Sequence, residues 1–225
     1  MAGMINAFKK IYQGQDWLVK NIILLIYAGF TAIYYIEFAG FEKNQGAVNP
    51  FIVMGMLIFN IYMGGYMLKF INNNFKNTDT LLPDFNADPL KVFLGALPLI
   101  IVWFIYYIIF SIVGLIPILG WIFILVVGSF VPFVFIEYAK NFNSDGLFSM
   151  GKVFSYIKPL FGSFVVLSSK FLILILIVLA ILFPIFYATK TPLYAMIFIF
   201  TYGGTIMYFA WLKCLVELYQ KKYEG

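Results

Sequence analysis

The chain has 225 residues, of which 63% are hydrophobic and 11% are charged, and its mean hydropathy is +0.95. This composition excludes a soluble domain and predicts an integral membrane protein. Because histidine is absent and Cys214 is the only cysteine, the sequence also excludes serine–histidine catalysis, histidine–zinc sites and an intramolecular disulfide.

All 15 basic side chains are lysines, since the sequence has no arginine, and with 10 acidic residues they give a net charge of +5. These lysines are spread over short segments that flank apolar blocks, so membrane topology explains them better than nucleic-acid binding, which would favour one basic stripe. The exclusive use of lysine is typical of an AT-rich prokaryotic genome. We therefore expect a prokaryotic membrane protein with no nucleic-acid partner.

The apolar blocks predict six transmembrane helices within one membrane domain that covers residues 1–225. The first block is long enough to remain as a helix rather than to be removed as a signal peptide. The charge-free stretch between Lys91 and Glu137 has 45 residues, too many for one span, so we divide it at the breakers between Gly114 and Gly120. The expected spans are 19–38, 50–71, 92–113, 118–139, 163–188 and 192–218.

Three helix starts share one sequence device. Asn49-Pro50, Asp88-Pro89 and Thr191-Pro192 each place a capping side chain before a proline. Such a side chain accepts hydrogen bonds from the first free backbone N–H groups, and proline fits the first helical turn. We expect helices to begin at these three points.

The lysines predict the orientation of the spans. Only Lys43 and Lys190 fall on one side of the six-span pattern, and the other thirteen fall on the side that holds both termini. By the positive-inside rule both termini face the cytoplasm, in the plasma membrane. Three segments on that side have amphipathic character and are expected to lie in the membrane interface or to dock a partner: 4–12, 81–93 and 147–160.

No ionisable side chain is expected deep in the membrane. Lys213 and Glu217 lie four residues apart near a span end and are expected to pair. Pro98, Pro132 and Pro184 are expected to kink or locally break their spans, which weakly favours a transport cavity.

The candidate functional residues are mild polar side chains and glycine pairs within the spans. Interhelical hydrogen bonds and close helix packing are their default interpretation, and a substrate cavity is the alternative. The residues are Asn60, Gly64, Gly65, Thr201, Gly203, Gly204 and Thr205.

An internal repeat is a further hypothesis. Aligning three spans on one glycine each places a phenylalanine five residues later in all three, near the lysine-bearing end. The pairs are Gly65 with Phe70, Gly128 with Phe133, and Gly204 with Phe209.

Three stretches carry a resemblance over nearly the whole chain: AFKKIYQGQDWLVKNIILL, GGYMLKFINN leading to TLLPDF, and EYAKNFNSDGLFSMGKVFSYIKP. Their order and layout resemble a prokaryotic family of multi-pass membrane proteins known only as a domain of unknown function. The resemblance implies a prokaryotic source and six helices. It carries no activity and no site residue to this chain.

The sequence thus predicts an all-α polytopic membrane helix bundle, with six transmembrane helices in three hairpins and short interfacial helices. The favoured function is a non-enzymatic membrane subunit or scaffold, without a cofactor or metal, that packs with other membrane proteins, copies of itself or lipid. A permease or export component for a small or amphipathic substrate is the alternative. An intramembrane enzyme ranks third.

Overall fold

The computed structural model describes residues 2–13, 16–44, 49–76, 82–83, 88–113, 131–142 and 150–223. All regular secondary structure in these residues is helical, as the sequence predicts. The helices are α1 (Ala2–Ile11), α2 (Trp17–Asn44), α3 (Pro50–Phe75), α4 (Pro89–Val113), α7 (Met150–Thr189) and α8 (Leu193–Tyr223), and residues 131–141 are also helical.

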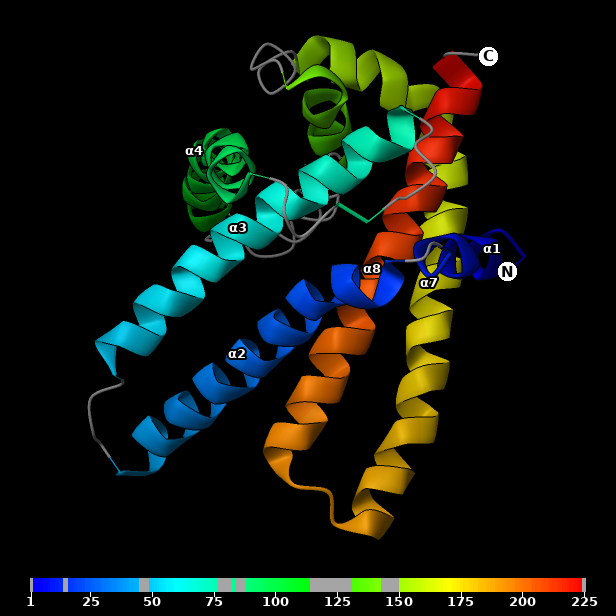
Figure 1. Ribbon diagram of the computed structural model, residues 1–225. Coiled ribbons are helices and arrows are strands. Elements are labelled where there is room, and N and C mark those ends of the chain that lie inside the picture. The colour runs from blue at the N-terminus through cyan, green and yellow to red at the C-terminus, as the bar shows by residue number, and fades with distance from the viewer. Residues whose placement is uncertain are drawn as a thin grey trace.

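Helix α8 is the centre of the bundle and packs against α1, α2, α3 and α7 (Figure 1). Helices α2 and α3 lie side by side, as do α7 and α8. Helix α4 packs against α3 and is seen nearly end-on in Figure 1, so it crosses the direction of the other long helices. Short α1 lies across α8, and the first turns of α7 lie across the end of the bundle near the C-terminus.

Five of the described helices are long and apolar enough to cross a membrane: Trp17–Phe38, Pro50–Phe75, Pro89–Val113, Lys158–Thr189 and Leu193–Tyr223. Their uncharged stretches run over 21–36, 50–68, 92–113, 171–189 and 193–212. At a rise of 1.5 Å per residue these stretches are about 24–33 Å long, close to the ~30 Å hydrocarbon thickness of a bilayer. Each of these stretches has a lysine directly at one end.

The expected span 118–139 lies largely outside the described residues, as does the tight turn expected between Gly114 and Gly120. The described part, 131–141, is helical. Phe133, Val134, Phe135 and Ile136 are all buried within it, so this segment packs inside the protein. The described residues thus contain five candidate spans.

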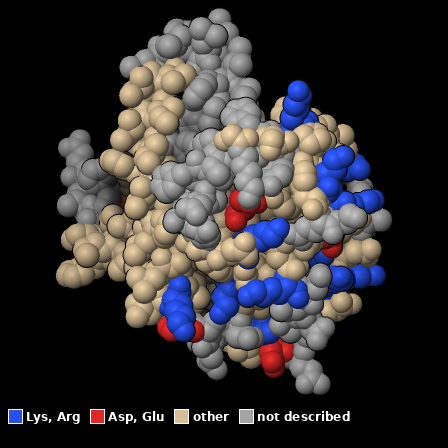
Figure 2. Space-filling model, turned by 90° about the horizontal axis from the view of Figure 1, so that it is seen from above, with Lys and Arg blue, Asp and Glu red and all other residues tan. Residues whose placement is uncertain are grey.

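The best-buried side chains gather at the lysine-bearing end of the bundle rather than midway along the helices. Most of the largest fully buried side chains come from the second half of α3, from 131–141 and from the second half of α8, and they include Tyr66, Phe70, Phe133, Phe209 and Leu215. Seen from above, this end carries many lysine side chains (Figure 2). Helices α3, α7 and α8 thus continue beyond their uncharged stretches, and a helical core lies at this end.

The helix starts at Pro50 and Pro89 agree with the sequence. Asn49 Oδ1 accepts from the backbone N–H of Phe51, at 3.0 Å. Asp88 Oδ1 accepts from the N–H groups of Leu90 and Lys91, at 3.2 and 3.4 Å. Both side chains satisfy donors that the first helical turn leaves free.

The start expected at Thr191-Pro192 is wrong in detail. Helix α8 begins at Leu193, and the carbonyl of Pro192, not the Thr191 side chain, accepts from the N–H groups of Ala195 and Met196. The Thr191 hydroxyl lies 2.6 Å from the Thr189 hydroxyl instead. The preceding residue, Lys190, has φ 51°, which ends α7 abruptly and draws Thr191 back against the end of that helix.

The expected amphipathic segments have different outcomes. Helix α1 is separate and buries Ala7 and Ile11 against the core, while Ile5 is exposed. Of segment 81–93, residues 82–83 and 88–93 are described, and Leu82 is buried. The third segment is not an independent helix, because α7 is continuous from Met150 into the membrane.

Pro98 and Pro184 do not break their helices, while the alternative expectation of a kink stays a prediction. Helix α4 continues through Pro98, and α7 continues through Pro159 and Pro184. Pro132 lies within the described helical residues 131–141, and the chain before residue 131 is outside the described residues. Neighbouring turns in a helix keep their own hydrogen bonds, so a proline need not end a helix in an apolar surrounding.

Candidate functional site: a cavity between α2, α3, α4 and α8

A cavity of about 660 Å³ lies among α2, α3, α4 and α8, with Phe135 also at its wall. Its lining is mainly aliphatic and aromatic. The lining residues are Tyr27, Leu57, Asn60, Ile61, Met63, Gly64, Met67, Ala96, Leu99, Ile100, Phe135, Phe200, Thr201, Gly204, Thr205, Tyr208 and Phe209. All four helices contribute through their uncharged stretches.

The structure brings most of the candidate residues together. Asn60, Gly64, Thr201, Gly204 and Thr205 all line this cavity, although they come from two helices far apart in the chain. Gly65 and Gly203 do not line it. The two groups of polar residues therefore meet because α3 and α8 pack against each other.

Polar groups of the cavity are partly used by internal hydrogen bonds. The Tyr27 hydroxyl donates to Asn60 Oδ1 at 2.9 Å and so links α2 to α3. The Thr205 hydroxyl donates to the backbone carbonyl of Thr201 at 2.7 Å, within α8. Among the described residues, neither the Asn60 amide hydrogens nor the Thr201 hydroxyl has a hydrogen-bond partner. Within the described part of the chain, these donors are therefore available to another polar group.

The four candidate glycines have different roles. A Cβ built on Gly65 would lie 1.9 Å from the carbonyl oxygen of Val92, so α3 and α4 touch backbone to backbone at this point. A Cβ at Gly64 would make ordinary contacts with Ala96 and Leu99, at 3.9 and 4.0 Å. Gly65 is thus a close-packing position between helices.

Gly203 and Gly204 are not close-packing positions, contrary to the default interpretation of the glycine pairs. A Cβ on either residue would meet no atom of the described residues within 4 Å. Gly204 instead leaves space at the cavity wall, whereas Gly203 lies outside the cavity.

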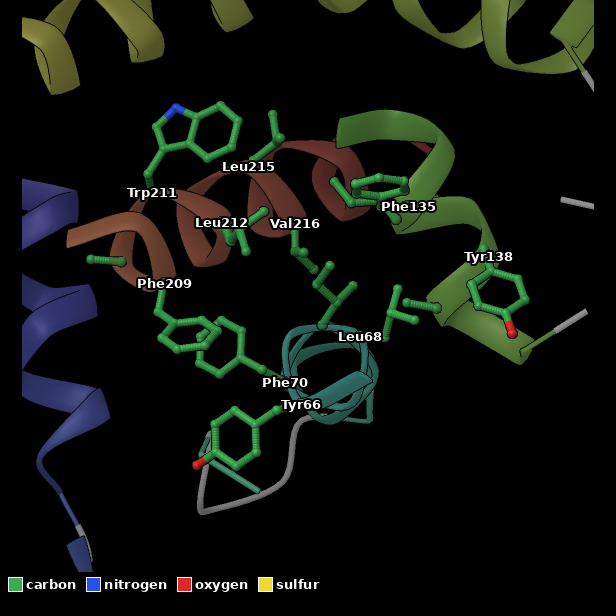
Figure 3. Close-up of a cluster of buried hydrophobic side chains, with 14 of the residues drawn as sticks. Tyr66, Leu68, Phe70, Phe135, Tyr138, Phe209, Trp211, Leu212, Leu215 and Val216 are labelled. Atoms are coloured by element: carbon green, nitrogen blue, oxygen red, sulfur yellow. The ribbon is translucent and has the colours of Figure 1, made fainter. Parts of the chain in front are cut away.

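Aromatic packing closes one side of the cavity. The rings of Phe70 and Phe209 lie 4.8 Å apart between their centroids, and Tyr66 lies edge-on to Phe209 at 6.0 Å (Figure 3). The Tyr66 hydroxyl donates to the backbone carbonyls of Lys20 and Pro83, which ties this wall to two other segments. All three phenylalanines of the hypothetical repeat, Phe70, Phe133 and Phe209, are buried in this core.

Among the described residues, no charged side chain lines the cavity. The nearest charge along α8 that the sequence singles out, Lys213, is buried and forms the expected ion pair with Glu217, whose side chain is half exposed. That pair lies further along the helix, at the lysine-bearing end. The cavity is therefore electrically neutral.

Sequence reasoning missed Tyr27 and Tyr208 as members of this site. Tyr27 is needed because its hydroxyl orients Asn60. Tyr208 stacks on Trp211, with ring centroids 5.6 Å apart. The signal for both was weak, because tyrosine is frequent in this chain and both lie among other aromatic residues.

A second polar group lies where α1 meets the bundle. The Tyr202 hydroxyl donates to Asn21 Oδ1 at 3.4 Å, and the Asn21 amide donates to the carbonyl of Trp17. Burial, and a hydrogen bond with Tyr202, raise the pKa of the Tyr12 phenol above its usual range. Tyr12 is therefore protonated at physiological pH, and this group acts as a neutral structural link.

The described residues contain no cluster of three or more histidine, cysteine, aspartate or glutamate side chains that could hold a metal ion. What the cavity offers is space, apolar contact and hydrogen-bond donors. That combination is suited to binding rather than to bond breaking.

Comparison with known proteins does not extend this description. No protein-family model matches the chain, and no curated protein or solved structure matches it significantly. The fold and the cavity therefore define its class, a polytopic helical membrane protein with an open cavity whose described lining carries no charge.

Proposed function

We propose that this protein is a non-enzymatic integral membrane subunit that packs with other membrane proteins and with lipid. In this proposal six spans form three hairpins in the plasma membrane of a prokaryote, with both termini in the cytoplasm. The lysines gathered at one end of the bundle support this orientation (Figure 2), because the positive-inside rule places such an end in the cytoplasm.

The observation that carries the proposal is the exposure of α7. Only 6% of its most apolar membrane stretch is buried against the described chain. Leu172, Leu176, Ile181 and Phe183 are each more than half exposed. A helix that contacts its own protein mainly through α8 has a long apolar face left for other membrane components.

Photo-crosslinking in native membranes tests this proposal. A photoreactive amino acid is placed at Leu176 on the exposed face of α7, and at Phe186 as the control. Phe186 is 6% exposed and packs edge-on against Phe200 of α8, with ring centroids 5.4 Å apart. Both positions lie on the same helix, so expression and insertion are matched.

A subunit should give a stoichiometric protein adduct from Leu176 and only an internal adduct from Phe186. The adduct should also co-purify in mild detergent without crosslinking. Lipid adducts alone at Leu176, together with a solitary particle in mild detergent, would contradict a role as a subunit.

The cavity favours a second candidate, a permease or export component. Asn60, Thr201 and Thr205 line a common space, and each lies near the middle of an uncharged stretch, where transporters commonly bind their substrates. Asn60 lies ten residues beyond Pro50 and nine before Lys69, so it is close to the middle of its span.

Substitution of Asn60 by leucine tests transport in proteoliposomes. The change removes the amide and keeps the side-chain size. Loss of transport, with the same protein content per vesicle, would support the cavity as a transport site. Unchanged transport would show that the cavity is not on the transport path.

A further inference from the structure

We propose that the cavity binds an uncharged single-chain amphiphile whose head group offers hydrogen-bond acceptors, such as the ester and hydroxyl oxygens of a monoacylglycerol. This inference rests on the second proposed function, the permease, and names the class of ligand that would bind in the same cavity. Binding itself requires neither transport nor a protein partner, so it is tested separately.

The ligand is uncharged because the described lining of the cavity offers no charge to pair with it. None of the lining side chains that the structure describes is a lysine, aspartate or glutamate. A carboxylate or ammonium group transferred into such a site loses its hydration and gains no counter-ion, which costs several kcal/mol. A fatty acid anion is thereby disfavoured against its neutral ester.

The head group offers acceptors because the free polar groups of the site are donors. Asn60 Oδ1 is already occupied by the Tyr27 hydroxyl, and this bond turns the amide hydrogens away from Tyr27. The Thr205 hydroxyl hydrogen is used by the Thr201 carbonyl. The Asn60 amide and the Thr201 hydroxyl are left to donate, and in the hydrocarbon region of a bilayer, where no water can accept, a donor without an acceptor is costly.

The tail is apolar because the rest of the lining is apolar. Met63, Met67, Leu99 and Phe200 form most of the walls around the polar groups. Methionine side chains adapt to flexible chains. The volume of about 660 Å³ lies inside the range of roughly 300–1,000 Å³ that is usual for small-molecule sites.

Equilibrium binding to the full chain in phospholipid nanodiscs tests the proposal. The probes are radiolabelled monolaurin and laurate, which share one acyl chain and differ in head-group charge. Gly204→Leu places a side chain in open space at the cavity wall, and Gly203→Leu is the matched control in the same glycine pair. Neither position has described atoms within 4 Å of a Cβ, so both variants are expected to fold.

Wild type and Gly203→Leu should bind monolaurin equally, and Gly204→Leu should bind it at least about tenfold more weakly. Laurate, ionised at alkaline pH, should bind wild type at least about tenfold more weakly than monolaurin. Asn60→Leu should weaken monolaurin binding by roughly threefold to tenfold, as expected for the loss of one or two neutral hydrogen bonds.

Equal binding to Gly204→Leu and wild type would overturn the site, because the signal would then be bulk partitioning into lipid. Equal affinity for laurate and monolaurin would overturn the neutral ligand class. If Gly204→Leu fails to fold, an unchanged affinity in Asn60→Leu overturns the proposal by itself. Binding without transport in proteoliposomes would reject the transport candidate and leave this inference standing.

Discussion

The contact between α3 and α4 at Gly65 leads to a quantitative prediction. Replacing Gly65 by alanine adds a Cβ that would lie 1.9 Å from the carbonyl oxygen of Val92, 2.8 Å from its carbonyl carbon and 3.1 Å from its Cγ1. The first two atoms belong to the backbone and cannot rotate aside. The two helices must therefore move apart by roughly 1 Å to restore an allowed contact.

The magnitude follows from a comparison with Gly64→Ala. In both variants the free energy of unfolding rises by up to about 1 kcal/mol, because alanine has a higher helix propensity than glycine. Only Gly65→Ala overpacks the contact, at a cost near the upper end of the usual range of ~1–3 kcal/mol. Because the gain in helix propensity is the same in both variants, Gly65→Ala should be less stable than Gly64→Ala by about 3 kcal/mol.

Equilibrium unfolding by titration with sodium dodecyl sulfate, followed by tryptophan fluorescence, measures both variants against wild type. Gly64→Ala should unfold at an equal or higher detergent fraction, and Gly65→Ala at a lower one. Equal stability of the two variants would refute the backbone contact between α3 and α4.

Three further predictions concern other parts of the protein. The Asn72 amide donates to two backbone carbonyls at 2.8 and 3.0 Å, so Asn72→Leu should lower the unfolding free energy by about 1–3 kcal/mol in the same titration. Lys213 is almost fully buried, and its partner Glu217 is half exposed. Glu217→Gln leaves the buried Lys213 charge without a partner, so it should lower the unfolding free energy more than Lys213→Met does. The reverse order would contradict this pairing. In a variant without the native cysteine, Lys190→Cys should react with an impermeant thiol reagent added outside intact cells, and Lys221→Cys only after the cells are opened; the opposite pattern would invert the topology.

The sequence predicted the helical class because long uncharged stretches leave the backbone no other way to satisfy its hydrogen bonds in lipid. Helix starts at Pro50 and Pro89 were predictable from local chemistry, since Asn49 and Asp88 act on groups two or three residues away. The start at Leu193 was not, because the tight return from α7 at Lys190 takes Thr191 out of the capping position.

Prediction was more limited for the site. Polarity within an apolar span identified Asn60, Thr201 and Thr205, since such residues need partners. Sequence could not distinguish the two glycine pairs, because both have the same local pattern. Only the placement of α4 makes Gly65 a contact, and only the space beside α8 leaves Gly204 open. These differences depend on packing between distant helices, which local patterns do not specify.

The central position of α8 has a consequence for biosynthesis. Helices α1, α2, α3 and α7 all pack against it, and all precede it in the chain. Ala7 of α1 and Phe70 of α3 therefore cannot reach their final surroundings until α8 has left the ribosome and entered the membrane. Until then the earlier helices lie in lipid without their contacts to α8. Forming contacts across such long chain separations is slow compared with local helix formation. We expect nascent chains that stop before α8 to be degraded by membrane quality-control proteases, whereas completed chains become resistant.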